Sequence, residues 1–161
     1  MQKIVYRKIT PGDKERIDSL IADRWGGNFI VVHDTIYYPS ALEGFIALNG
    51  TDSAGLITYK IESSLCEIVT LDSFIENKGV GSELISLALK DAKTKKCNTL
   101  WLITTNDNIH AIEFYQKRGF QLTEVFPYAV NEARKLKPSI PKVAQNKIPI
   151  RDELKFSYII K

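Results

Sequence analysis

The sequence predicts a single α/β domain over residues 1–161, and three patterns support that fold class. Three apolar segments separated by short polar turns indicate an antiparallel meander of strands, at residues 45–48, 54–61 and 66–71. An amphipathic helix begins at Val80, and the apolar run of residues 100–103 behind it is typical of a buried strand. A chain of 161 residues with 44% hydrophobic side chains can bury a core of this kind.

The first part of the chain predicts a strand, a helix and an unassigned segment. Residues 3–9 are rich in β-branched and aromatic side chains, which favours a strand that Pro11 ends. A helix then begins after Asp13, and four apolar residues recur on its inner face: Ile17, Leu20, Ile21 and Trp25. Two glycines and an asparagine at residues 26–28 end that helix. Residues 28–43 mix aromatic and β-branched residues and support neither a helix nor a strand.

The helix that begins at Val80 has the clearest periodicity in the chain. Its apolar residues lie three and four positions apart, at Leu84, Ile85, Ala88, Leu89 and Ala92. The apolar run of residues 100–103 then predicts a strand that is buried on both faces.

The last part of the chain predicts two helices and two strands. A helix is expected at residues 109–117, where Gly119 ends it, and a strand at residues 120–125. Residues 129–136 favour another helix, a loop with three prolines follows, and alternation at residues 154–160 indicates a closing strand.

Composition excludes several classes of function. With 22 basic and 19 acidic residues the net charge is +3, too balanced to demand a nucleic acid partner. Cys66 and Cys97 lack metal-ligand spacing and the chain has two histidines, so no metal is expected. No stretch is long and apolar enough for a membrane span or leader, so we expect a cytoplasmic protein without a membrane partner. The basic residues near the C-terminus, interrupted by prolines, indicate a solvated face: Arg134, Lys135, Lys137 and Lys142.

A glycine turn opens the helix at Val80 and predicts a phosphate site. Gly79 and Gly81 let the backbone approach a ligand closely, and the unpaired amides of a first helical turn favour an anion. A dinucleotide-binding fingerprint would need a third glycine where Leu84 stands. A P-loop would need lysine after its glycine, whereas Lys78 precedes Gly79.

The order of this turn, its helix, the apolar strand and the segment 108–120 resembles the GNAT superfamily of N-acetyltransferases. The segment 108–120 reads Asn-x-x-Ala-x-x-Phe-Tyr-x-x-x-Gly-Phe, as in that family. Further segments, at residues 24–27, 100–108, 136–141 and 148–153, are similar to a subgroup whose acceptor is unassigned. The resemblance implies a mixed, mostly antiparallel central sheet flanked by helices, with acetyl-CoA as co-substrate. Glu76 departs from it, because the family usually has Arg or Gln there.

The resemblance also implies which residues hold coenzyme A. It assigns the pyrophosphate to the turn amides, with the Ser82 hydroxyl as a further donor: Lys78, Gly79, Val80, Gly81 and Ser82. It places the thioester carbonyl at the backbone amide of Leu71, beside Thr70. Asn108 would lie near the pantetheine arm, and Asn106 is a second candidate that also fits a turn or helix cap.

Two residues are predicted to move protons. Tyr115 stands at the family's general-acid position and would protonate the departing thiolate, although a core tyrosine is the alternative interpretation. Glu67 is the candidate base, and strand alternation predicts that its side chain shares a face with Val69 and Leu71. Because four strand residues span about 13 Å, Glu67 would act through water. A carboxylate paired with a strand lysine is the alternative, and three residues could substitute as base: Asp72, Glu43 and His33.

The leading functional hypothesis is transfer of an acetyl group from acetyl-CoA to a primary amine of a small molecule or peptide, directly within a ternary complex. A non-catalytic acyl-CoA sensor or interaction module is the alternative. Residues 28–43 would cap the acceptor pocket of such a fold. Aromatic and histidine side chains near it are candidates for the pocket wall or for ordinary core: Trp25, Phe29, His33, Tyr37 and Tyr38. Either a monomer or a homodimer fits the sequence.

Overall fold

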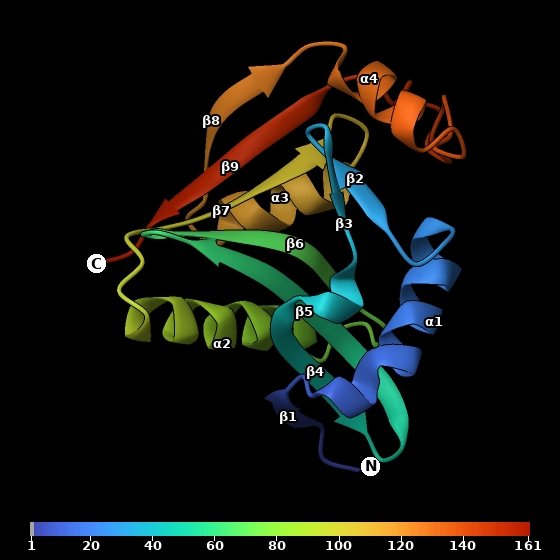
Figure 1. Ribbon diagram of the computed structural model, residues 1–161. Helices are drawn as coiled ribbons and strands as arrows, with labels where there is room; N and C mark the ends of the chain where they lie inside the picture. The colour runs from blue at the N-terminus through green and yellow to red at the C-terminus, as the bar shows by residue number, and fades with distance from the viewer. Residues whose placement is uncertain (1) are drawn as a thin grey trace.

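The computed structural model describes residues 2–161, which are organised around one seven-stranded sheet of order β1-β4-β5-β6-β7-β9-β8 (Figure 1). Its strands are β1 (Val5–Lys8), β4 (Glu43–Asn49), β5 (Asp52–Glu62), β6 (Leu65–Ser73), β7 (Thr99–Thr105), β8 (Gln121–Phe126) and β9 (Glu153–Ile159). Neighbouring strands are antiparallel except β6 and β7, which are parallel. The mixed, mostly antiparallel sheet is therefore confirmed.

Helices lie around this sheet, as predicted. They are α1 (Lys14–Trp25), α2 (Val80–Thr94), α3 (Ile109–Lys117) and α4 (Ala129–Leu136), with 3-10 turns at Pro11–Asp13 and Pro39–Ala41. The unassigned segment forms a separate hairpin of β2 (Ile30–Val32) and β3 (Thr35–Tyr37). Its turn residues His33 and Asp34 both have positive φ, 46° and 64°. Glycine and asparagine are the usual residues at such positions of a tight hairpin turn. Because this turn has other residues there, the sequence did not indicate the hairpin.

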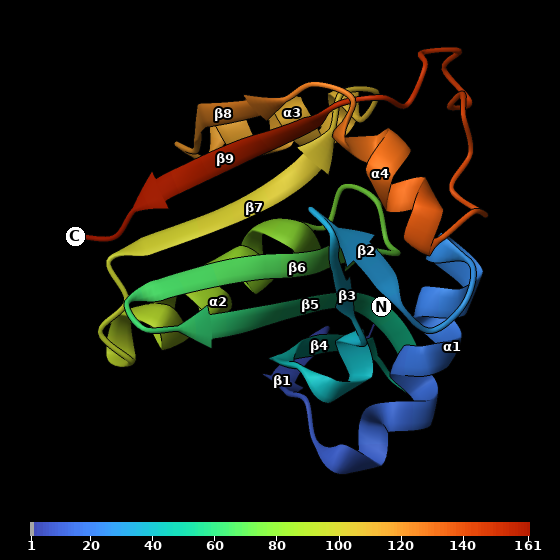
Figure 2. The same cartoon turned by 45° about the horizontal axis from the view of Figure 1, so that its top comes forward.

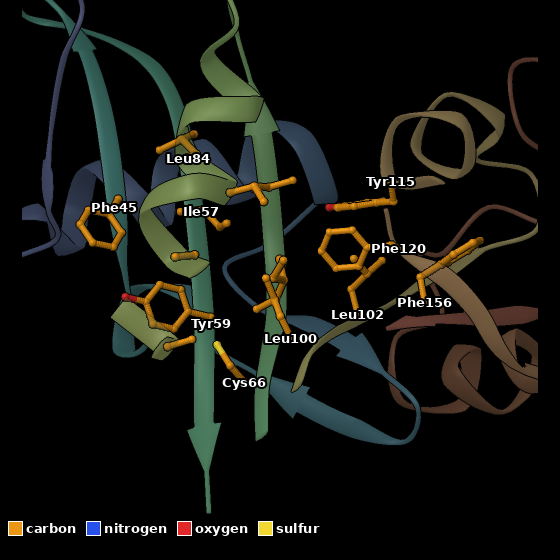
Figure 3. Close-up of a cluster of buried hydrophobic side chains, with 14 of the residues drawn as sticks. Phe45, Ile57, Tyr59, Cys66, Leu84, Leu100, Leu102, Tyr115, Phe120 and Phe156 are labelled. Carbon is orange, nitrogen blue, oxygen red and sulfur yellow. The ribbon is translucent and has the colours of Figure 1, made fainter. Parts of the chain in front are cut away.

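Two hydrophobic clusters pack on opposite faces of the central strands. On one face, Ile57 and Tyr59 of β5 contact a cluster that includes Leu84 of α2 and Tyr115 of α3 (Figure 3). On the other face, Leu56 packs in a smaller cluster with three buried residues: Ile17, Ile21 and Ile30. The sheet thus separates α2 from α1, and the ends of both helices meet the same part of β6.

A β-bulge interrupts β6 in the middle of the sheet. Thr58 pairs with Thr70 and Tyr59 pairs with Ile68, so Val69 is an extra residue. Glu67 pairs with Lys60, which lies on the opposite face of β5 from Ile57, the partner of Leu71. The prediction that Glu67, Val69 and Leu71 share one face is wrong for Leu71, because strict alternation does not survive an inserted residue.

The parallel strands β6 and β7 part beyond this bulge. Their pairing runs from Leu65 with Thr99 to Ile68 with Leu102 and then stops, although both strands continue to Ser73 and Thr105. Figure 2 shows the two strands side by side at one end and well separated at the other. The sheet is consequently open between the C-terminal halves of β6 and β7.

The strand β7 differs from the prediction in its burial. Leu100 and Leu102 are buried, but Trp101 and Ile103 are half-buried. The Lys155 ammonium lies 4.4 Å from the centre of the Trp101 ring. In a strand that is buried on both faces, a helix would cover that side chain instead. The prediction of burial on both faces is therefore wrong. Among helices within residues 2–161, none has the length and apolar character that a membrane crossing requires.

Candidate functional site

The glycine turn forms the N-terminus of α2, as the sequence indicated. Gly79 is the N-cap, with φ of 69°, and a Cβ atom added there would meet no other atom within 4 Å. A Cβ atom on Gly81 would lie 3.2 Å from the Phe114 ring of α3. Gly79 is thus favoured because its backbone is left-handed, and the space around it is open. Gly81 is favoured because it lets α2 and α3 pack closely. The first helical hydrogen bond is from Glu83 to Gly79, so the amides before Glu83 have no partner inside the helix.

A cation that the sequence analysis did not identify lies beside this turn. Arg118 donates from Nε to Ser82 Oγ at 3.0 Å and from Nη1 to the Phe114 carbonyl at 2.9 Å. Its guanidinium stacks 3.4 Å from the centre of the Phe114 ring. Arg118 follows α3 in the chain, so its proximity to Ser82 depends on tertiary packing. Lys78 and Glu76 are both exposed on the turn itself.

A cavity of about 380 Å³ adjoins the turn and gathers residues from α1 and from four later segments. Leu71 and Asp72 come from β6, Gly81 from α2, Asn108 from the loop after β7 and Tyr115 from α3. Of the predicted site residues, Leu71, Gly81, Asn108 and Tyr115 therefore meet in one place. This first cavity also contacts Arg24 and Trp25 at the end of α1.

Tyr115 is buried and extends from α3 with its hydroxyl toward β6 (Figure 3). The rings of Phe114 and Phe120 meet it edge to face, each 5.3 Å away between centroids. Burial raises the pKa of the Tyr115 phenol, and the negative charge of Asp72 raises it further. The hydroxyl consequently stays protonated at neutral pH.

Asp72 is the carboxylate that lines the first cavity. It is 4% exposed, and Arg24 Nε lies 3.2 Å from its Oδ1, with Trp25 Nε1 3.5 Å from Oδ2. Burial raises the pKa of Asp72, while the Arg24 charge opposes that shift. A carboxylate with a raised pKa can accept a proton more readily than an exposed one.

Glu67 lies elsewhere, under the β2–β3 hairpin. It is buried and accepts a hydrogen bond of 2.6 Å from the Tyr37 hydroxyl. Burial raises the pKa of Glu67, and the Tyr37 hydrogen bond opposes the shift. Glu67 does not line the first cavity. Of the other proposed bases, Glu43 pairs with Lys95 at the end of α2, and His33 pairs with Glu153.

The remaining predicted residues make hydrogen bonds within the protein. The Thr70 hydroxyl is buried against that of Thr58, 2.6 Å away. Asn106 accepts from the amides of Arg151 and Asp152, each at 3.0 Å, and so holds the C-terminal loop. Asn108 caps α3 by accepting from the Ala111 amide at 3.2 Å.

A second cavity, of about 350 Å³, lies where β6 and β7 part. It shares Arg24, Trp25 and Asn108 with the first cavity, so the two adjoin. The hairpin residues Ile30 to Val32 and the helix α4 also border it, which agrees with the expectation that residues 28–43 cover a pocket. Of the five ring-bearing residues suggested for its wall, Trp25 lines this second cavity and the other four do not.

Comparison with known proteins identifies the family. Residues 12–120 match the acetyltransferase (GNAT) family, so the chain belongs to the GNAT acetyltransferases. Uncharacterized protein YdhI of Bacillus subtilis (strain 168) is 47% identical over 148 residues, which are 91% of this chain and 92% of that protein.

Solved structures share the fold. A Bacillus subtilis acetyltransferase in complex with CoA matches with a TM-score of 0.67 and 21% identity, over 100% of both chains. A GNAT family acetyltransferase from Elizabethkingia anophelis with acetyl-CoA bound matches with a TM-score of 0.69 and 18% identity, over 99% of each chain. At these identities the likeness is one of fold, and it agrees with the family assignment.

Proposed function

We propose that this protein transfers an acetyl group from acetyl-CoA to a primary amine of a small molecule or peptide, within a ternary complex. One observation carries the proposal: the first cavity joins the open end of α2 to Leu71 and Tyr115, and a second cavity adjoins it. A donor in the first cavity and an acceptor in the second would then meet at Arg24, Trp25 and Asn108, which line both cavities.

The start of α2 suits the pyrophosphate of coenzyme A. The amides of Val80, Gly81 and Ser82 point to the helix N-terminus, where the helix dipole favours an anion. Arg118, held at Ser82, adds the positive charge that the resemblance expected at Glu76. The open space around Gly79 leaves room for a phosphate to approach the backbone.

The proton transfers can be assigned to two residues of the first cavity. The amine loses a proton to a base, its lone pair attacks the thioester carbon, and the Leu71 amide polarises the carbonyl. The carbon–sulfur bond then breaks, and the thiolate takes a proton from Tyr115. The nitrogen, which is positively charged after its attack, releases its second proton, and this proton restores the Tyr115 phenol. Asp72 is better placed than Glu67 to be the base, because Asp72 shares the cavity with Tyr115. Glu67 would need a chain of water from beneath the hairpin.

A thiol-release assay with acetyl-CoA and a panel of primary amines tests the proposal, together with calorimetric titration of CoA. We expect CoA binding and amine-dependent release of free thiol, with an N-acetylated product detectable by mass spectrometry. Binding without turnover on any amine would support the acyl-CoA sensor instead. Failure to bind CoA would remove both functions.

A further inference from the structure

The second cavity has one wall that neither a helix nor a strand forms. Strands β6 and β7, the β2–β3 hairpin and α4 supply the other walls, and backbone hydrogen bonds fix each of them. His33 at the hairpin tip also hydrogen-bonds to Glu153, which lines the cavity. The remaining wall is the C-terminal loop, residues 137–152, between α4 and β9. Within residues 2–161, every backbone hydrogen bond of residues 138–150 stays inside this loop, so side chains must attach it to the domain.

Arg134 of α4 attaches the loop. Its guanidinium donates from Nε to the Ile140 carbonyl at 3.2 Å, and from Nη2 to the carbonyls of Pro141 and Ile150, each at 2.6 Å. Those same three residues line the second cavity. Nη1 donates to Asn131 Oδ1 at 2.8 Å, one turn earlier on α4, and this bond orients the planar fork of donors. One side chain thus holds both ends of the wall.

Lys137 makes a similar attachment where the loop begins. It is 6% exposed, and its Nζ donates to the carbonyls of Trp25 and Phe29, at 2.8 and 2.7 Å. The loop is thereby joined to the end of α1, beside the boundary of the two cavities. The prediction of a solvated basic face is wrong for Arg134 and Lys137, because their N–H groups donate to carbonyls of the protein.

The loop presents apolar side chains to the cavity. Ile140, Pro141 and Ile150 line it together with apolar residues of the parted strands and the hairpin: Ile30, Val32, Val69 and Ile103. Between such walls, each methylene group removed from water is worth about fourfold in binding. An acceptor with a carbon chain would therefore bind best when the loop is held in place.

We infer that Arg134 is a positioning residue for the acceptor: it holds the C-terminal loop as the wall against which the carbon chain of an apolar primary amine packs. This inference rests on the proposed function. Arg134 does not line either cavity beside Tyr115, and it acts through the main-chain carbonyls of Ile140, Pro141 and Ile150.

Steady-state kinetics with propylamine and hexylamine test the inference, because these acceptors differ only by three methylene groups. The ratio of kcat/KM, hexylamine over propylamine, is measured on one protein preparation, so any loss of folded protein cancels. For the unaltered protein we expect a ratio of at least about tenfold. In Arg134→Met the ratio should fall below about threefold through a higher KM for hexylamine, while the CoA dissociation constant changes by less than about twofold.

Further variants separate the hydrogen bonds of Arg134 from its charge. Arg134→Lys keeps the charge but lacks the planar fork, so it should also lower the ratio. The control is Lys135→Met, which removes an exposed cation of the same helix and should leave the ratio unchanged. If Arg134→Met does not fold, Asn131→Ala removes only the group that orients the fork, and the ratio should fall by a smaller factor. Calorimetric titration of CoA confirms that each variant retains a folded cofactor site.

The outcomes separate the two proposals. A ratio near one in the unaltered protein would overturn the inference and leave the acetyltransferase proposal standing. Equal losses for both amines in Arg134→Met, or a ratio that survives every substitution at Arg134 and Asn131, would do the same. If CoA binds and no amine reacts, calorimetric affinities of hexylamine and propylamine for the CoA complex give the ratio instead. Equal affinities, or no binding, would then overturn the inference.

Discussion

Asp72 and Tyr115 line one cavity from two different elements, β6 and α3, and the charge of Asp72 adds to the effect of burial in raising the pKa of Tyr115. If Asp72 accepts the proton of the amine, that charge disappears. The Tyr115 phenol then becomes a better acid at the stage when the thiolate leaves. The two residues are therefore coupled in the direction that acetyl transfer requires.

Tyr115→Phe should lower kcat by about 100-fold, because general acid catalysis is typically worth that much or more. The ring and its edge-to-face contacts remain, so the CoA dissociation constant should change by less than about twofold. Thiol-release kinetics and calorimetry measure the two quantities. An unchanged kcat would show that the thiolate leaves without help from this phenol.

The two candidate bases can be distinguished by pH profiles. The raised pKa of Asp72 predicts that kcat/KM increases with pH through a range above that of an ordinary aspartate, as the carboxylate ionises. Asp72→Asn should remove this limb and lower kcat/KM by about 100-fold. Glu67→Gln should retain the limb. If Glu67→Gln alone removes it, Glu67 is the base and acts through water.

Gly79→Ala tests the backbone of the turn. At φ of 69° an alanine is strained by about 1 kcal/mol, which should appear in the free energy of unfolding and weaken CoA binding. Gly12→Ala is the matched control, since its Cβ atom would meet its nearest neighbour at 3.7 Å and its φ is not positive. Urea denaturation of both variants should separate them. Equal stability would show that the turn relaxes without cost.

The ion pair of Arg7 and Asp13 predicts a pH-dependent stability. Arg7 donates to both Asp13 oxygens at 2.8 Å, which holds the pKa of Asp13 well below its usual range. A lowered folded-state pKa means that the contribution is fully present above pH of about 4 and is lost as pH falls through the folded pKa.

Asp13→Asn should accordingly lower the free energy of unfolding by about 1 to 2 kcal/mol at pH 7, with the difference shrinking below pH 4. Glu113→Gln, which breaks an exposed pair with Lys117, is the control and should show little change. Urea titrations across this range would contradict the prediction if the Asp13→Asn difference were independent of pH.

Much of the fold could be predicted because the spacing of apolar residues along a helix or strand can be read from a short stretch of sequence. Residues 109–117 and 129–136 form α3 and α4 with the predicted bounds, and the meander and α2 are also present. The β2–β3 hairpin escaped detection because its turn uses His33 and Asp34 in place of glycine. The bulge at Val69 escaped because a single inserted residue leaves no mark in an alternating apolar pattern.

The sequence predicted those residues of the candidate site that belong to a recognisable motif. It did not predict the residues that reach the site only through tertiary packing. Gly81 and Tyr115 line the first cavity, and Gly79 is the N-cap of the helix α2 that begins beside it. Arg118 and Glu153 reach their sites only through the folding of distant segments, and neither stands in a pattern that indicates its partner. The prediction that Leu71 shares a face with Glu67 was wrong because the inserted residue Val69 breaks the alternation between them.

The parting of β6 and β7 leaves the sheet with two inner strand edges. Alternate backbone amides and carbonyls of residues 69–73 and 103–105 face the opening rather than a neighbouring strand, because the pairing stops at Ile68 and Leu102. A peptide-like ligand arm lying there would become a strand in its own right. We therefore expect hydrogen–deuterium exchange at these residues to slow when CoA binds, because their backbone amides would then donate to the bound ligand. The co-substrate would thus complete the hydrogen bonding of the sheet as well as supply the acetyl group.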